Sequence, residues 1–183
     1  VYHGPDGLTH IAKKIHNSTC VLAEKLSSLG LKQLNANFFD TIRIKIDVEK
    51  IKNEANLKEV NFYYPDKNTV SISINETTSI DDLNTIVSIF STATKTDTDK
   101  ILKLSDKTNI PKVLIRKTEF LTNSVFSKYR SESELMRYIK TLERKDLSLT
   151  HSMIPLGSCT MKLNAAAEML PLSWNRWINI HPF

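Results

Sequence analysis

The sequence predicts an α/β protein built around a small α+β domain, and three observations support this fold class. Apolar residues recur at steps of three and four over residues 7–29, which is the period of one helix face. Apolar and polar residues alternate over residues 38–46 and 70–74, which is the period of a half-buried strand. A second helical period over residues 80–90 predicts a helix that covers the apolar face of those strands.

The composition is that of a soluble globular protein. The chain has 183 residues, of which 40% are hydrophobic and 25% are charged, so it lacks the signature of a disordered chain. No apolar run approaches the roughly 18 residues of a membrane span, and no basic-then-apolar leader is visible. The first residue is Val1 rather than Met, which suits a processed or partial chain.

The charge pattern and the cysteines exclude several classes of partner. The net charge is +5, but cations and acids are interspersed along the chain, whereas nucleic-acid-binding surfaces cluster Lys and Arg. We therefore expect no nucleic-acid partner. Cys20 and Cys159 lie far apart and form no CxxC pair, which disfavours a zinc ribbon and a disulfide scaffold and fits a reducing compartment.

The first predicted helix runs from about Gly7 to Leu29. Asp6 is its expected N-cap, because a carboxylate accepts hydrogen bonds from the free amides of the first turn. Gly30 is its expected end, because glycine enters the left-handed conformation without a Cβ clash. About 23 residues at 1.5 Å each span roughly 34 Å, which is long enough to run between two domains. The expected apolar face comprises Leu8, Ile11, Ala12, Ile15, Leu22, Leu26 and Leu29.

Residues 38–90 are predicted to fold as β-α-β-β-α, with a small antiparallel sheet and helices on one face. The first strand, residues 38–46, has isoleucine at 42, 44 and 46 and cations between them, so one face is expected to be wet. A weaker, Lys- and Glu-rich helix follows over residues 48–57. The strands bury one face only, and the helices supply its cover.

A hairpin and a helix complete this domain. Residues 61–64 lead into the turn cluster 65–68, in which Pro sets φ, and residues 70–74 form the return strand. Ser79 and Asp82 resemble a capping box with Asp in place of Glu. The helix that follows has the expected apolar face Ile80, Leu83, Ile86, Val87 and Phe90.

Residues 91–118 are polar and rich in Thr, Lys and Asp, and we interpret them as a connector at the domain edge. A short helical turn is expected within it, near residues 100–104. A last clear helix follows a second capping box, formed by Ser131 and Glu134. Its expected apolar side comprises Leu135, Met136, Tyr138, Ile139 and Leu142.

The residues from His151 onward differ in composition, with both tryptophans and three of the six prolines. Ser158, Cys159 and Thr160 form a cluster of small hydroxyl and thiol residues ahead of an expected helix. Amides at a helix start and Ser or Thr hydroxyls bind anions, although the same cluster also fits an ordinary turn with an N-cap. The sequence contains no GxGxxG, P-loop, HExxH or metal-ligand spacing.

This segment also has a family resemblance. Residues 151–164, HSMIPLGSCTMKLN, resemble the SMIPLGSCTMKLN block of the glycine decarboxylase P-proteins, and residues 179–183, NIHPF, resemble the block that follows it. Residues 2–12 are similar to the family's Y-H/N-G-P-x-G-L-x-x-I-A, and residues 120–132 are similar to its FLTHxVFNxYHSE. The resemblance spans the chain, and residues 47–115 are its least diagnostic part.

The resemblance implies a protein with two tandem aminotransferase-like halves of fold type I. This chain is similar to the small C-terminal domain of the first half joined to the opening of the second, which implies the single-chain form. On that basis we expect an interdomain helix at 1–30, a small α+β domain at 31–118, a connecting helical segment at 119–150 and the start of the second half at 151–183.

The activity that the resemblance implies is that of glycine dehydrogenase (decarboxylating). Pyridoxal phosphate (PLP) serves as the electron sink for glycine decarboxylation, and the aminomethyl group passes to the lipoyl group of the partner H-protein. The full-length chain is expected to be a homodimer in the bacterial cytoplasm or the mitochondrial matrix. The family's PLP lysine follows a His in a Gly-rich context that is absent here, so the fragment alone is expected to be inactive. The alternative is a noncatalytic docking or accessory domain of the same assembly.

The expected site residues are Ser158, Cys159 and Thr160, as a wall of the glycine and PLP pocket. No catalytic residue is expected in the chain itself: Lys162 is expected to be a structural or phosphate-side cation rather than the Schiff-base lysine.

Two residues depart from the family pattern, because Asn123 and Arg130 stand where the family usually has His. Both replacements remove a titratable imidazole. His151 and His181 are expected to be hydrogen-bonded structural residues. The isolated chain is expected to associate through exposed apolar side chains, namely Trp174, Trp177, Ile178 and Phe183.

Overall fold

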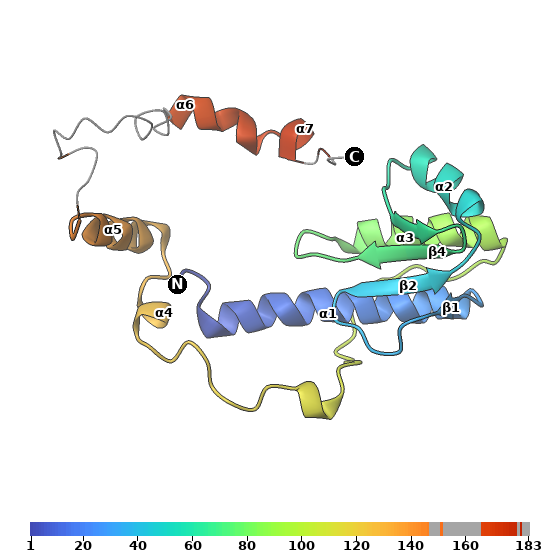
Figure 1. The fold of residues 1–183 in the computed structure, drawn as a ribbon, viewed down its shortest axis with the longest axis horizontal. Coiled ribbons are helices and arrows are strands. Elements are labelled where there is room, and N and C mark those ends of the chain that lie inside the picture. Colours follow the sequence, from blue (N-terminus) through green and yellow to red (C-terminus); the bar gives the residue numbers. More distant parts are fainter. Residues whose placement is uncertain (147–150, 152–165, 179, 181–183) are drawn as a thin grey trace. The chain divides into compact units, whose positions relative to one another are not determined.

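The computed structural model describes residues 1–146, 151, 166–178 and 180. The chain divides into two compact units, Val1–Leu135 and Met136–Phe183. Along the first unit the order is α1, β1, β2, α2, β3, β4 and α3, followed by η1, α4 and the start of α5 (Figure 1). Within the described ranges, no helix is long and apolar enough to cross a membrane.

The longest helix, α1 (Gly4–Ser28), begins earlier than the sequence predicted. His3 is its N-cap residue and makes no side-chain cap hydrogen bond, and Asp6 lies within the first turn. The predicted Asp6 cap is therefore wrong. Pro5, near the helix start, explains the difference, because proline has a helical φ and lacks the amide that would need a cap.

The predicted end of α1 at Gly30 is confirmed. Gly30 has φ 78°, and its amide donates to the Ser27 carbonyl, while the Leu31 amide donates to the Leu26 carbonyl. This pair of hydrogen bonds is the Schellman arrangement, and it turns the chain sharply toward the sheet.

Only the second half of α1 packs into the core. Leu22 and Leu26 are fully buried, whereas Leu8 is 43% exposed. Ile11 and Ile15 are half-buried. In Figure 1 the first half of α1 extends past the sheet, which explains why the predicted apolar face is buried at one end only.

The four strands form one antiparallel sheet in the order β1-β2-β4-β3, so the predicted small antiparallel sheet is confirmed. Their bounds are β1 Lys32–Gln33, β2 Thr41–Lys45, β3 Tyr63–Asp66 and β4 Thr69–Ser73. The sequence did not predict β1, because two residues are too short for a period-2 pattern.

The register of β2 on β4 places the branched side chains on one face. Ile42 lies opposite Ile72, and Ile44 lies opposite Val70. None of these four side chains is more than 3% exposed. Arg43, between the two isoleucines, is exposed. The sheet therefore has one buried and one wet face, as predicted.

The hairpin turn is shorter than predicted. Strand β3 extends through Asp66, so only Lys67 and Asn68 connect it to β4. The Asp66 carboxylate accepts a hydrogen bond from the Asn68 amide at 2.8 Å. This bond, with a second from Thr69, lowers the pKa of Asp66.

Both predicted helices of this domain are present. Helix α2 (Val48–Leu57) has the predicted bounds, and the Asp47 carboxylate caps it. Helix α3 (Ile80–Thr94) starts with the predicted capping box. The Ser79 amide donates to the Asp82 carboxylate at 2.8 Å, and the Asp82 amide donates to the Ser79 hydroxyl at 3.1 Å.

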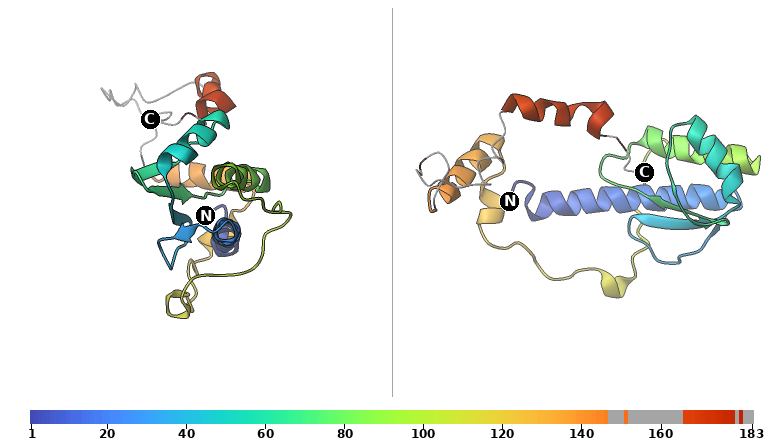
Figure 2. Two further views of the ribbon diagram at one scale, coloured as in Figure 1. Left: turned by 90° about the vertical axis from the view of Figure 1, so that its right-hand side faces the viewer. Right: turned by 45° about the horizontal axis from the view of Figure 1, so that its top comes forward.

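Helix α3 contacts both α1 and α2. The left view of Figure 2 shows α1 and α3 nearly end-on, with their axes roughly parallel. Leu83, Ile89 and Phe90 of α3 are fully buried. Ile89 was not on the predicted face, and it is buried because α3 is covered on more than one side.

The connector after α3 contains no helix near residues 100–104, so the predicted helical turn is wrong. Instead, the Asn84 side chain of α3 binds the backbone of the connector at Ile101. Its amide nitrogen donates to the Ile101 carbonyl at 3.0 Å, and its oxygen accepts from the Ile101 amide at 2.8 Å. Ile101 itself is only 3% exposed, so the connector contributes to the core.

The remaining elements are short, apart from one helix. They are η1 Lys112–Leu114, α4 Val125–Lys128, α5 Glu132–Glu143, α6 Ala166–Met169, η3 Leu170–Ser173 and α7 Asn175–Ile178. The predicted capping box of α5 is present, since the Glu134 amide donates to the Ser131 hydroxyl and the Ser131 amide donates to the Glu134 carboxylate. The predicted apolar side of α5 is largely exposed in this chain.

Candidate functional site

The predicted pocket-wall residues Ser158, Cys159 and Thr160 lie outside the described residues, as does Lys162. His181 and Phe183 are also outside them, and His151 is described and exposed. Three other places in the described part of the chain bring polar or aromatic side chains together.

The first place is the start of α1, where two of the resembling blocks meet. Gly4 is buried with φ 62°, and the Arg130 guanidinium packs directly over it. A Cβ atom added to Gly4 would lie 2.9 Å from Arg130 Nε and closer still to its terminal nitrogen. Arg130 Nη2 also lies 3.6 Å from Asp6 Oδ2. Arg130 therefore joins residues 2–12 to residues 120–132.

Asn123, the other departure from the family pattern, is part of the start of α4. Its carboxamide oxygen accepts a hydrogen bond from the Val125 amide at 3.1 Å, and its carbonyl accepts from the Phe126 amide at 3.0 Å. In this chain, Asn123 therefore binds the backbone at the start of α4, and Arg130 packs over the backbone at Gly4.

The second place is a polar cluster around His16, which is 3% exposed. His16 Nδ1 lies 2.9 Å from the Phe39 carbonyl oxygen, and Nε2 lies 3.0 Å from the Asn109 amide nitrogen. A carbonyl only accepts and an amide N–H only donates, so these partners assign the proton to Nδ1 of a neutral ring. Thr108 Oγ1 and Cys20 Sγ also lie within reach of Nε2, at 3.1 Å and 3.4 Å.

A hollow of about 400 Å³ adjoins this cluster, and its lining includes Cys20, Glu24, Gln33, Lys107 and Asn109. Lys107 Nζ lies 2.8 Å from Glu24 Oε1, and this hydrogen bond raises the pKa of Lys107. Burial raises the pKa of the Cys20 thiol, so the thiolate that a nucleophile needs is disfavoured. The described residues also contain no group of three His, Cys, Asp or Glu that could hold a metal ion.

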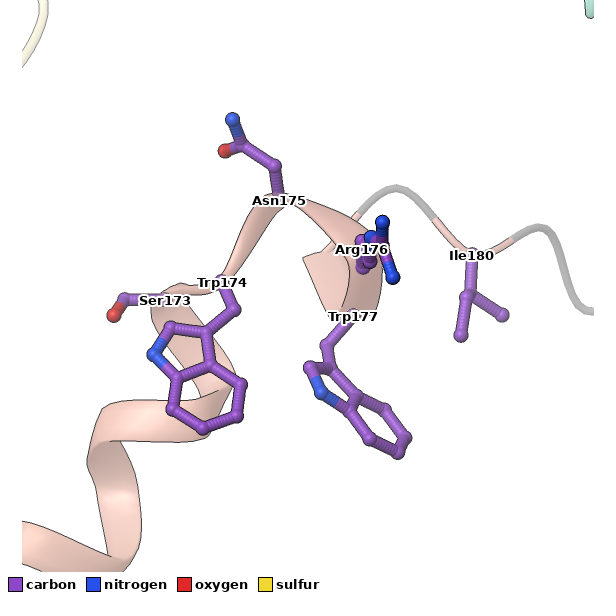
Figure 3. A pocket seen from close by; sticks show the side chains of 6 residues that line it. All are labelled: Ser173, Trp174, Asn175, Arg176, Trp177 and Ile180. Atoms are coloured by element: carbon purple, nitrogen blue, oxygen red, sulfur yellow. The ribbon is translucent and has the colours of Figure 1, made fainter.

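The third place lies in the second unit, in and beside α7. Trp174, Trp177 and Ile180, with Ser173, Asn175 and Arg176, line an open hollow of about 780 Å³. Figure 3 shows both indoles and Ile180 on one side of the backbone, with Asn175 pointing the other way. Trp174, Trp177 and Ile178 are more than half exposed, as predicted for them.

Comparison with known proteins gives a consistent result. The family profile of the glycine cleavage system P-protein matches residues 1–90. A protein of Christiangramia forsetii named glycine dehydrogenase (decarboxylating) is 57% identical over all 183 residues, and one of the same name from Flavobacterium johnsoniae is 56% identical over the same length. A mitochondrial relative from Flaveria pringlei, glycine dehydrogenase (decarboxylating) A, is 44% identical over 186 residues.

This chain belongs to the glycine cleavage system P-protein family. It spans about 19% of the length of the two bacterial relatives and 18% of the plant one, while each match covers the whole of this chain. The motifs at both ends of the chain therefore predicted the family correctly.

Sequence reasoning did not identify the cluster around His16. One signal was present: His16 and Cys20 are four residues apart, so both lie on one face of α1, and Ala23 continues that face into the core. A polar side chain on a buried helix face needs partners. Its partners, however, come from residues 39 and 109, and nothing local in the sequence joins them to His16.

Proposed function

We propose that this chain is an internal segment of a PLP-dependent glycine decarboxylase, the P-protein of the glycine cleavage system. The observation that supports this most is the match to the Christiangramia forsetii relative, at 57% identity over all 183 residues. The relatives named above bear the name glycine dehydrogenase (decarboxylating). The activity of the whole enzyme is therefore our proposal for the longer protein of which this chain forms about a fifth.

The described residues do not fit a PLP site. A lysine that forms an imine with PLP is activated by desolvation or by a neighbouring cation, and no lysine among the described residues is buried. We propose that the imine-forming lysine lies outside this chain, because the Gly-rich, His-Lys context that the resemblance implies is absent from the sequence, and PLP bound there would supply the electron sink for decarboxylation. Ser158, Cys159 and Thr160 remain the proposed wall of that pocket.

The described residues have a supporting role in this proposal. The α+β domain at 31–118 is the proposed small domain of a fold type I half, and residues 1–30 are the proposed interdomain helix. Gly4 and Arg130 fix the free end of that helix against the segment that leads to residues 151–183, the proposed start of the second half.

The proposed partners follow from the reaction. The aminomethyl group would pass to the lipoyl group of the H-protein, and the full-length chain would form a homodimer. Relatives of this chain include bacterial and mitochondrial proteins, so the proposed compartment is the bacterial cytoplasm or the mitochondrial matrix.

A chimera tests the proposed function. The 183 residues would replace the matching segment of the Christiangramia forsetii relative, and glycine-dependent exchange of carbon dioxide would be measured with PLP and lipoylated H-protein. We expect exchange activity in the chimera and no PLP imine in the isolated chain. A folded chimera that binds H-protein without exchange would instead favour the accessory-domain alternative. A borohydride-trapped imine on Lys162 of the isolated chain would contradict the proposal that the imine-forming lysine lies outside this chain.

A further inference from the structure

Six large apolar side chains in the second unit share an unusual exposure. They are Leu170, Leu172, Trp174, Trp177, Ile178 and Ile180. Three of them, Trp174, Trp177 and Ile180, line the hollow beside α7, and we call these three the tryptophan surface. Each is between 57% and 63% exposed. Single exposed apolar residues are ordinary on protein surfaces, whereas a contiguous group usually marks a contact site.

Backbone hydrogen bonds set the geometry of this surface. The Trp174 amide donates to the Pro171 carbonyl at 3.1 Å, and the Trp177 amide donates to the Trp174 carbonyl at 2.8 Å. The two indoles are thus three residues apart on consecutive turns, and both point to the side on which the hollow of about 780 Å³ lies (Figure 3). An aromatic surface with an adjoining hollow is suited to receive an apolar side chain from another segment.

The elements around this surface are too short to be stable alone. Helix α6, η3 and α7 each comprise four residues, far below the roughly 12 to 15 residues that an isolated helix needs. No described residue after Leu135 is buried, so the described part of the second unit has no core of its own. Among the described residues, none supplies this segment with a buried apolar contact, so its stability must come from a contact outside the described part of the second unit.

We infer that the tryptophan surface docks onto a part of the same polypeptide that lies beyond these 183 residues. This inference rests on the proposed function, because the relatives are about five times as long as this chain, which spans 19% of their length while matching over all 183 residues. Obligate contacts have this apolar character, whereas surfaces of transient partners are more polar. The occupant is an apolar segment with a bulky side chain that fills the hollow.

Hydroxyl-radical footprinting tests the inference, because Trp174 and Trp177 are the only tryptophans in this chain. Labelling of their peptide would be compared between the isolated chain and the chimera described above, at several protein concentrations. We expect rapid labelling in the dilute isolated chain and a several-fold lower rate in the chimera, independent of dilution. Equal labelling in both proteins would overturn the inference. Protection in the chimera that disappears on dilution would assign the surface to a second copy instead.

A matched pair of variants checks that the contact matters. Trp177→Ser in the chimera should lower its thermal midpoint. The control is Leu57→Ser, which changes an exposed leucine at the end of α2 and should leave the midpoint unchanged. Equal effects of the two variants would contradict docking. These readouts are independent of catalysis, so an inactive chimera with protected tryptophans would refute the proposed function and leave the docking surface intact.

Discussion

His16 Nε2 accepts a hydrogen bond from the backbone amide of Asn109 at 3.0 Å, across 93 residues of chain. The imidazole also stacks on the Phe39 ring with a centroid separation of 5.7 Å. One buried side chain on α1 thus joins the loop before β2 to the connector after α3. The connector pairs with no strand, so side chains such as His16 and Asn84 supply the hydrogen bonds that hold it in place.

Replacing His16 should loosen the connector. His16→Ala leaves the half-buried Asn109 amide without its acceptor, at a cost of about 1 kcal/mol, the lower end of the range for a buried donor. We expect faster tryptic cleavage after Lys107 and a lower free energy of unfolding. The control is His10→Ala, which changes an exposed histidine on the same helix and should leave the cleavage rate unchanged. Equal cleavage of the two variants would mean that the connector is held by other contacts.

The two faces of β2 should respond differently to the same truncation. Ile44→Ala removes a side chain that is 1% exposed, and such changes cost about 2–5 kcal/mol. Arg43→Ala changes the neighbouring residue on the wet face and should alter stability by less than about 0.5 kcal/mol. Urea unfolding followed by far-ultraviolet circular dichroism measures both. A large effect of Arg43→Ala would show that the exposed face is in contact with another surface.

Alanine substitutions at Gly30 and Gly4 should have different effects, because the first adds only backbone strain and the second also adds a steric overlap. Gly30→Ala introduces only strain, since φ is 78° and no atom lies within 4 Å of the added Cβ, and we expect a loss of about 1–2 kcal/mol. Gly4→Ala adds an overlap with the Arg130 guanidinium to a similar strain. Gly4→Ala should therefore increase hydrogen exchange in the first turns of α1, whereas Gly30→Ala should leave it unchanged. Shortening Arg130 to Ser in the Gly4→Ala background should restore part of the protection.

The Cys20 thiol should be slow to react and should make stability depend on alkaline pH. Burial raises its pKa above the ordinary value of 9.0. The thiol therefore ionises more readily in the unfolded chain, so its contribution to stability is complete below pH 9.0 and is lost as the pH rises toward the folded-state value. In a Cys159→Ser background, alkylation of native Cys20 should be much slower than alkylation in urea. Equal rates would mean that the thiol is accessible.

Local patterns in the sequence predicted the α+β domain because each element has its own signal. The alternation around Ile42 and Ile44 predicted β2, and the Ser79 and Asp82 pair predicted the start of α3. Errors occurred where a distant contact decides the conformation. The connector near Ile101 is not helical, and Asn84 of α3 binds its backbone from 17 residues away, so no short window of neighbouring residues contains that information.

The candidate site was less predictable. The motif at residues 151–164 predicted the family, yet the three pocket-wall residues lie outside the described part of the chain, so their role stays a prediction. The contact of Arg130 with Gly4 required two motifs to meet in space. Each motif was visible in the sequence, but their separation of more than 120 residues concealed the contact.

The partial packing of α1 has a mechanical consequence. The helix has 25 residues and is about 38 Å long at 1.5 Å per residue, and its second half is fixed to the sheet. It therefore acts as a stiff lever, in which a small rotation of the sheet becomes a larger displacement of Gly4 and Arg130 at the far end. Because the hydrogen bonds of a helix are internal, such a displacement of the first turn needs no local unfolding of α1.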